Sequence, residues 1–99
     1  MQSSYFEAIL QIRPADQKVL DYVYARIYER KNVFVSKEVQ TKTGIDIYLS
    51  DQKFARMLGP KLKKVFGGTV KSTRSLFSVD RQRSKKIYRV TVCYRLEGK

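Results

Sequence analysis

Histidine and tryptophan are absent from this 99-residue chain, and cysteine occurs once, as Cys93. Such a composition cannot supply a disulfide or a Cys/His zinc site, so we expect no metal and a reducing compartment. Catalysis is also hard to build, because the carboxylates are scattered singly and no nucleophile has a histidine base. We therefore expect no enzyme activity, no catalytic residue, no cofactor and no small-molecule substrate.

Long hydrophobic runs are missing as well. No stretch approaches the roughly 18 apolar residues of a membrane-spanning helix, and Met1-Gln2-Ser3-Ser4 lacks the basic and apolar regions of a secretion signal. These absences predict a cytoplasmic protein that does not enter a membrane. With 42% apolar residues, seven Tyr and five Phe, the chain has enough apolar material for one folded domain over residues 1–99.

Acidic residues are few and unevenly placed. Nine Asp/Glu stand against 21 Lys/Arg, which gives a formal net charge of +12. Residues 1–52 hold seven of each kind, so the whole excess lies in residues 53–99, where 14 Lys/Arg meet only Asp80 and Glu97. Solubility needs a net charge of only about 2–8. Since a phosphate backbone is the commonest partner for such a charge, the sequence predicts nucleic-acid binding.

Alternating apolar residues predict five strands. In the first, Phe6, Ala8, Leu10 and Ile12 share one face, as in a strand with one buried side. The strands are expected over residues 5–13, 33–40, 45–49, 69–79 and 86–96. The last two would form a long hairpin around the basic loop 80–85.

Two helices are predicted between these strands. Asp16 can cap the first, whose apolar stripe runs over residues 19–28. Ser50 can cap the second, from about residue 51 to 66, and Gly67-Gly68 would end it. A phosphate-loop interpretation of these glycines fits less well, because they follow a helix instead of opening one.

The second helix contains Gly59-Pro60 in its middle. An interior proline costs about 3 kcal/mol, so we expect a kink or a break, or two short helices if Pro60 opens a new first turn. The order strand, helix, strand, strand, helix, strand, strand predicts an α+β fold. We expect a ferredoxin-like split β-α-β sandwich, with one antiparallel sheet, two helices on one face and an extra C-terminal strand.

Basic residues cluster in two parts of the second half. One group spans the 80–86 loop and the last hairpin, where strand alternation puts Arg89 and Arg95 on one face and makes Arg74 a candidate to join them. The other group lies near the end of the second helix. The predicted RNA-binding residues are Arg81, Arg83, Lys85, Lys86, Arg89, Arg95, Arg74, Lys71, Lys61, Lys63 and Lys64.

Other polar and aromatic residues allow further interpretations. Asp46 and Asp51 can in principle hold a magnesium ion, although a surface role for Asp46 and a cap role for Asp51 fit better. Cys93 is more often a packing residue than a reactive one. The strand tyrosines can stack on bases, although half-buried packing is commoner. These tyrosines are Tyr5, Tyr48, Tyr88 and Tyr94. No DNA-reading or RNP motif occurs, so structured RNA bound through its backbone and shape fits best.

Three segments occur in an order and spacing typical of one protein family. They are YFEAILQIR at 5–13, GIDIYL at 44–49 with the helix that follows it to 66–68, and YRVTVCYRL at 88–96. Together they resemble the central α/β domain of the large-ribosomal-subunit export adaptor family, which is named for the third nonsense-mediated-decay protein. Archaeal members look closest. The resemblance runs from about Tyr5 to Leu96.

This resemblance implies binding to the large ribosomal subunit during its maturation or quality control. The expected partners are ribosomal RNA and neighbouring ribosomal proteins. Family members also carry a zinc domain and further β-rich domains; we expect the central module to stand alone here, without the activities of those parts. A ribosomal protein and a transient assembly factor both remain open. The rival interpretations are a basic module that binds an acidic protein and a non-specific nucleic-acid-binding protein.

Overall fold

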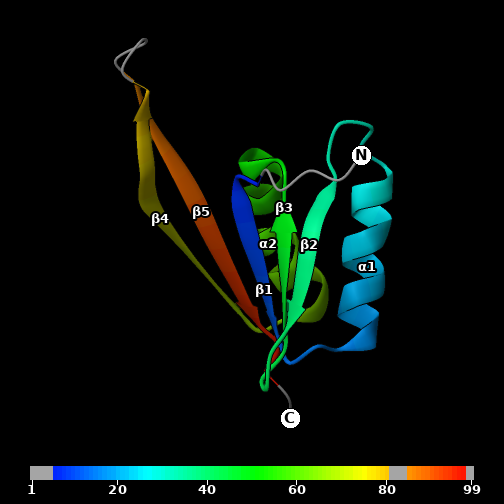
Figure 1. The fold of residues 1–99 in the computed structure, drawn as a ribbon. Coiled ribbons are helices and arrows are strands. Elements are labelled where there is room, and N and C mark those ends of the chain that lie inside the picture. The colour runs from blue at the N-terminus through cyan, green and yellow to red at the C-terminus, as the bar shows by residue number, and fades with distance from the viewer. Residues whose placement is uncertain (1–5, 81–84, 98–99) are drawn as a thin grey trace.

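The computed structural model describes residues 6–80 and 85–97, with side chains for 6–75 and 88–97. Its helices and strands follow the predicted order (Figure 1). They are β1 (Ala8–Arg13), α1 (Gln17–Tyr28), β2 (Val35–Gln40), β3 (Ile45–Leu49), α2 (Gln52–Phe66), β4 (Thr69–Asp80) and β5 (Lys85–Arg95). The predicted α+β class is confirmed.

The five strands form one mixed sheet in the order β2-β3-β1-β5-β4. β1 runs antiparallel to β3 but parallel to β5, so the predicted purely antiparallel sheet is wrong. A ferredoxin-like sheet would place the strand after α2 directly beside β1, whereas here β4 lies outermost and β5 returns between them. The amino-acid composition of the two strands explains why β5, and not β4, lies beside β1. Val90, Val92 and Tyr94 of β5 are buried, while residues 71–75 of β4 are polar and exposed, so the more apolar strand takes the inner position.

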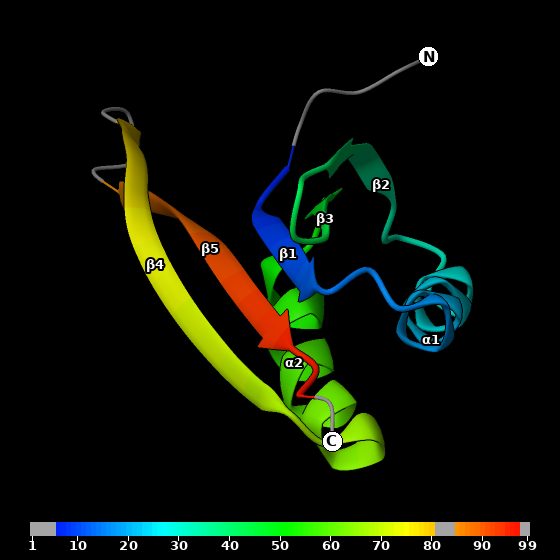
Figure 2. The same ribbon diagram turned by 90° about the horizontal axis from the view of Figure 1, so that it is seen from below.

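Both helices pack on one face of this sheet, as predicted (Figure 2). Alternate residues of β1, β3 and β5 point toward them and form one hydrophobic core. In β1 these are Ala8, Leu10 and Ile12, all fully inaccessible to solvent. The residues between them point to the opposite side, which no described helix covers. We call that side, to which Gln11 and Tyr48 point, the open face.

The helix ends follow the sequence signals with one shift. Asp16 caps α1 as predicted, because its carboxylate accepts two backbone N–H bonds from the first turn. Asp51, and not Ser50, caps α2. The Ser50 hydroxyl instead accepts a bond from the backbone N–H of Phe34. At the other end, Gly67 has a φ of 81° and ends α2 as predicted.

Gly59-Pro60 does not divide α2, which is continuous from Gln52 to Phe66. Gly59 is buried against the sheet: a Cβ there would lie 2.8 Å from Cγ1 of Val92 and 3.0 Å from Cγ1 of Val70. Pro60, the next residue, is exposed. The predicted break is absent because packing of α2 against β5 and β4 stabilises the helix across the proline.

Two aromatic residues lie away from the faces predicted for them. The Tyr28 side chain is 88% exposed and does not continue the buried stripe of α1. Phe6 does not share the face of Ala8, because the chain bends at Glu7 and β1 begins only after it. The Phe6 ring instead contacts Tyr48 on the open face.

The final hairpin extends past the rest of the sheet (Figure 1). Residues 90–95 of β5 pair with β1, whereas residues 85–89 pair with β4 alone. At about 3.3 Å per residue, this two-stranded part is about 17 Å long. We call it the arm. Asp80 and Lys85 are the last described residues at its far end.

Candidate nucleic-acid interface

Cations from four of the five strands share the open face. Strand pairing places them there: Lys71 lies opposite Cys93, and Lys37 lies opposite Tyr48. The cations of this face are Arg13, Lys37, Lys71, Arg89 and Arg95. The structure thus brings together Lys71, Arg89 and Arg95 of the predicted residues.

Asp46 is the only carboxylate on the open face among the described strand side chains, and it is already paired. Nη2 of Arg13 donates to its Oδ1 at 2.7 Å, with only 13% and 16% of the two side chains exposed. Nη1 of Arg13 donates at 3.2 Å to the carbonyl oxygen of Ile45. Since this ion pair is neutral, the described side chains of the open face carry a net positive charge.

Two neighbouring aromatic rings lie between two cations on the open face. Nζ of Lys37 lies 4.6 Å from the centre of the Tyr48 ring. The Tyr48 ring meets the Phe6 ring edge to face, with 4.7 Å between their centres. Cζ of Arg89 lies 3.8 Å from the centre of the Phe6 ring, and its Nε donates to the Phe6 carbonyl oxygen at 3.1 Å. We call Lys37, Tyr48, Phe6 and Arg89 the aromatic ladder.

Arg74 does not join the open face, so its predicted place beside Arg89 and Arg95 is wrong. The hairpin register puts Arg74 opposite Val90, whose side chain is in the core. Its guanidinium lies 4.7 Å from the centre of the Tyr88 ring. Residues that pair directly across two neighbouring strands point to the same face of the sheet. Arg74 is therefore on the helix side of β4, as Val90 is on the helix side of β5.

The predicted basic cluster of α2 lies on the opposite side of the molecule from the open face. Lys61, Lys63 and Lys64 are exposed. Lys53 and Arg56 join them, and α2 contains no carboxylate. Lys63 and Lys64 in the last turn also interact favourably with the helix dipole. The predicted cluster of α2 is thus a surface separate from the open face.

Four predicted residues remain. Arg81 and Arg83 lie outside the described residues. Lys85 and Lys86 belong to β5, but their side chains also lie outside the description. A phosphate-contacting role for these four residues stays a prediction.

The tyrosines considered for stacking have different environments. Tyr48 is on the open face, whereas Tyr94 is buried and its hydroxyl donates to the carbonyl oxygen of Gly67. Burial, and to a lesser degree the charge of Asp16, raises the pKa of Tyr94. Tyr88 contacts Arg74 on the helix side, and Tyr5 lies outside the described residues. Among the described tyrosines of the strands, Tyr48 alone points to the open face.

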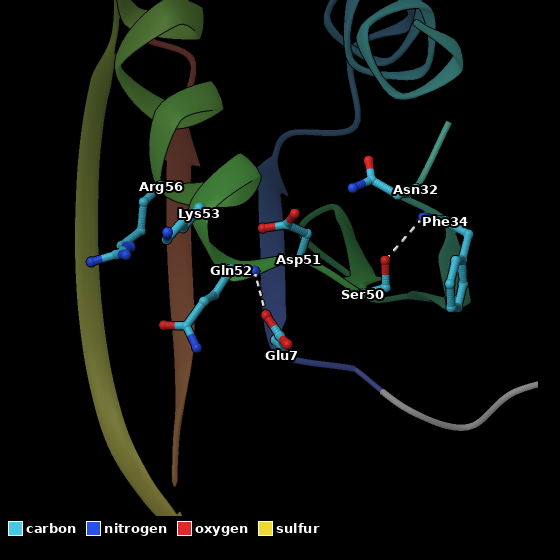
Figure 3. A pocket seen from close by; sticks show the side chains of 8 residues that line it. All are labelled: Glu7, Asn32, Phe34, Ser50, Asp51, Gln52, Lys53 and Arg56. Carbon is cyan, nitrogen blue, oxygen red and sulfur yellow. Dashed lines mark hydrogen bonds between the residues drawn. The ribbon is translucent and has the colours of Figure 1, made fainter. Parts of the chain in front are cut away.

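A hollow of about 530 Å³ lies at the N-terminus of α2 (Figure 3). Its polar groups bond to one another: the Glu7 carboxylate accepts from the N–H of Gln52 at 3.0 Å, and the Ser50 hydroxyl accepts from the N–H of Phe34 at 3.0 Å. The Asp51 carboxylate also faces the first turn as its cap. Because two carboxylates already occupy this helix end, we do not assign the hollow to phosphate binding.

The alternative magnesium site is not supported by the positions of its two carboxylates. Asp46 is bonded to Arg13 on the open face, while Asp51 caps α2 on the other side of the sheet. Among the side chains of residues 6–75 and 88–97, no three His, Cys, Asp or Glu gather into a group that can hold a metal ion. In the same ranges, neither helix is long and apolar enough to cross a membrane.

Together these features define a small α+β domain that presents a positively charged sheet face. Residues 5–96 match the family described as NMD3, second domain. The chain belongs to the NMD3 family, which confirms the resemblance seen in its sequence. No curated protein matches the chain. Membership relates the chain to the large-subunit export adaptor family, and thus to the biogenesis of the large ribosomal subunit.

Proposed function

We propose that this domain binds ribosomal RNA of the large subunit through its open face and the end of its arm. The observation that carries the proposal is the charge of the open face, where the one carboxylate that the described strands place there, Asp46, is neutralised by Arg13. Family membership supplies the large subunit as the setting. A small protein with this charge gains binding free energy mainly from phosphates.

The spread of the cations favours a polyanion over a compact acidic site. Both Lys37 and Lys71 point to the open face, but Lys37 is on β2 and Lys71 is on β4, which are the two edge strands of the sheet. Four spacings of about 4.8 Å separate these strands, so the cations cover about 19 Å of surface. Several phosphates of one RNA backbone can contact a surface of this width together.

The salt dependence of binding follows from the number of phosphates contacted. Each neutralised phosphate lowers log K by about 0.7–0.9 per log unit of salt. If Lys71, Arg89 and Arg95 contact one phosphate each, the slope is about 2–3, and raising salt from about 50 to 200 mM weakens binding roughly 20- to 40-fold.

Sedimentation with purified large subunits tests the surface. We expect Lys71→Gln with Arg95→Gln to reduce the salt slope by about 1.4–1.8 and to weaken binding by more than about tenfold near 0.1 M salt. The matched control is Lys18→Gln with Lys31→Gln, which removes the same charge from exposed positions away from the sheet. Equal losses in both pairs would show that the open face is not the contact surface.

Two further experiments separate the rival interpretations. The quadruple change of Arg81, Arg83, Lys85 and Lys86 to Gln is expected to weaken sedimentation with large subunits, and an unchanged result removes the arm from the interface. Nuclease treatment is expected to abolish the association. A complex that persists after nuclease would indicate an acidic protein partner instead of RNA.

A further inference from the structure

We propose that the aromatic ladder is a stacking platform for unpaired nucleotides, so that the open face selects single-stranded or looped RNA over continuous duplex. This inference rests on the proposed function, since it names the kind of RNA that the face binds. It assigns to Phe6, Tyr48, Lys37 and Arg89 a role that charge alone does not give them.

The two rings are on the surface although the core does not need them. The hydrophobic core fills the opposite face of the sheet, and neither Phe6 nor Tyr48 belongs to it. Both rings stay partly exposed. Partly exposed rings on a sheet are the feature by which common RNA-binding sheets hold bases.

The row of the sheet beside Tyr48 leaves room for a base. Ile9 pairs with Tyr48 on one side and with Thr91 on the other, so these three residues lie side by side on the open face. Ile9 and Thr91 have shorter side chains than the ring. A base can therefore approach the ring above them without meeting a second bulky group of that row.

The cations at both ends of the ladder suit a nucleotide better than an isolated aromatic ligand. Lys37 lies over one face of the Tyr48 ring and Arg89 lies over one face of the Phe6 ring, which places positive charge at each end of the ladder. A stacked base brings a phosphate on each side, and these phosphates meet the cations. The Arg89 guanidinium is itself a planar group on which bases stack.

Duplex RNA lacks the group that the ladder recognises. In an A-form helix the bases are stacked on one another, and proteins contact mainly the backbone and the shallow groove. A duplex can therefore use the charge of the open face but not its rings. The ladder predicts a preference that depends on bases and not on the number of phosphates.

Three RNA probes of equal phosphate number test this preference. They are a labelled 12-nucleotide oligouridine, an abasic ribose-phosphate 12-mer and a short duplex with the same total of phosphates. The variant is Tyr48→Leu, which removes the ring and keeps an apolar side chain. The matched control is Tyr28→Leu, the same change at a tyrosine that is 88% exposed on α1. Tyr48→Phe keeps the ring and serves as the rescue.

We expect the unchanged protein to bind oligouridine at least about fivefold more tightly than the abasic strand, as one stacked base predicts. Tyr48→Leu should remove this difference without changing the salt slope, whereas Tyr48→Phe and Tyr28→Leu should keep it. Loss of folding would instead weaken binding to all three RNAs equally, and circular dichroism of each variant checks for it.

The failures of the two proposals are distinguishable. If oligouridine and the abasic strand bind equally, or if Tyr48→Leu weakens duplex binding as much as oligouridine binding, the stacking platform is wrong while RNA binding stands. If none of the three RNAs binds and the large subunit does not bind either, the proposed function fails, and the platform with it.

Discussion

Asp46→Asn removes the one carboxylate that the described strands place on the open face, with almost no change of shape. In the unchanged protein, Nη2 of Arg13 donates to Oδ1 of Asp46 at 2.7 Å. The Asn side chain still offers an oxygen to this donor. What is lost is the charge of that bond. The bond to an amide oxygen keeps only the charge of the guanidinium, so we expect a loss of about 1–2 kcal/mol out of the roughly 1.5–3 kcal/mol that a hydrogen bond to a charged group contributes.

Arg13 keeps its other contacts in this variant. Its Nη1 donates at 3.2 Å to the carbonyl oxygens of Ile12 and Ile45, which satisfies part of the guanidinium. This is why the loss should be smaller than the roughly 3–5 kcal/mol found when a fully buried pair loses one partner. For a domain of this size, about 1–2 kcal/mol lowers the melting temperature by about 5–15 °C.

The same change should strengthen RNA binding. A unit charge about 6–10 Å from a phosphate interacts with it by about 0.4–0.7 kcal/mol in water. Removing the negative charge of Asp46 therefore raises affinity about two- to threefold at low salt, and less at high salt because of screening. The variant thus becomes less stable but binds RNA more tightly, an outcome that general damage to the fold does not produce.

Melting curves and fluorescence anisotropy with a labelled ribosomal RNA fragment measure the two effects. Asp21→Asn is the control, because it adds the same net charge on the exposed surface of α1. If Asp46→Asn and Asp21→Asn raise affinity equally, only net charge matters, and the reasoning about the open face is refuted. An unchanged melting temperature for Asp46→Asn would refute the energetic role of the ion pair.

Two further predictions concern the core. The raised pKa of Tyr94 means that the unfolded chain ionises first, so stability is fully present below about pH 10 and falls as pH rises from there through the folded-state pKa. Tyr94→Phe should reduce this alkaline loss in urea unfolding between pH 8 and 11, at a loss of about 1 kcal/mol at neutral pH because the Gly67 carbonyl loses its donor; an unaltered alkaline slope would contradict it. Gly59→Ala gains about 1 kcal/mol of helix propensity but overpacks Val92 and Val70, at about 1–3 kcal/mol, so we expect a net loss of up to about 2 kcal/mol. A more stable Gly59→Ala variant would show that the helix and the sheet can move apart at little cost.

The sequence predicted the helices and strands well, because alternation and capping depend on residues that are close together in the chain. The alternation in residues 45–49 and the capping carboxylate of Asp16 depend only on near neighbours in the sequence, and the structure contains both features. The inner position of β5 depends on a choice between distant strands. The apolar residues of β5 favour an inner position, but its parallel pairing with β1 joins segments that are far apart in the sequence.

The binding face was harder to predict because it depends on register and on bends. Arg74 falls on the helix side through its pairing with Val90, which strand alternation within β4 cannot reveal. Phe6 reaches the open face because the chain bends at Glu7, before β1 begins. Lys37 was missed because an irregularity in β2, between residues 35 and 37, interrupts the alternation that would have placed it.

The outermost position of β4 has a consequence for the behaviour of the protein in solution. A long outer strand presents unpaired backbone groups, to which a strand of a second copy can bond. Lys71 points to the open face and Arg74 to the helix side, so each side of this edge carries a cation. Two such edges that approach one another would bring like charges together on both sides of the joint. The charge available for phosphates thus also opposes aggregation through the sheet edge, as lysines do on the edge strands of many β-proteins.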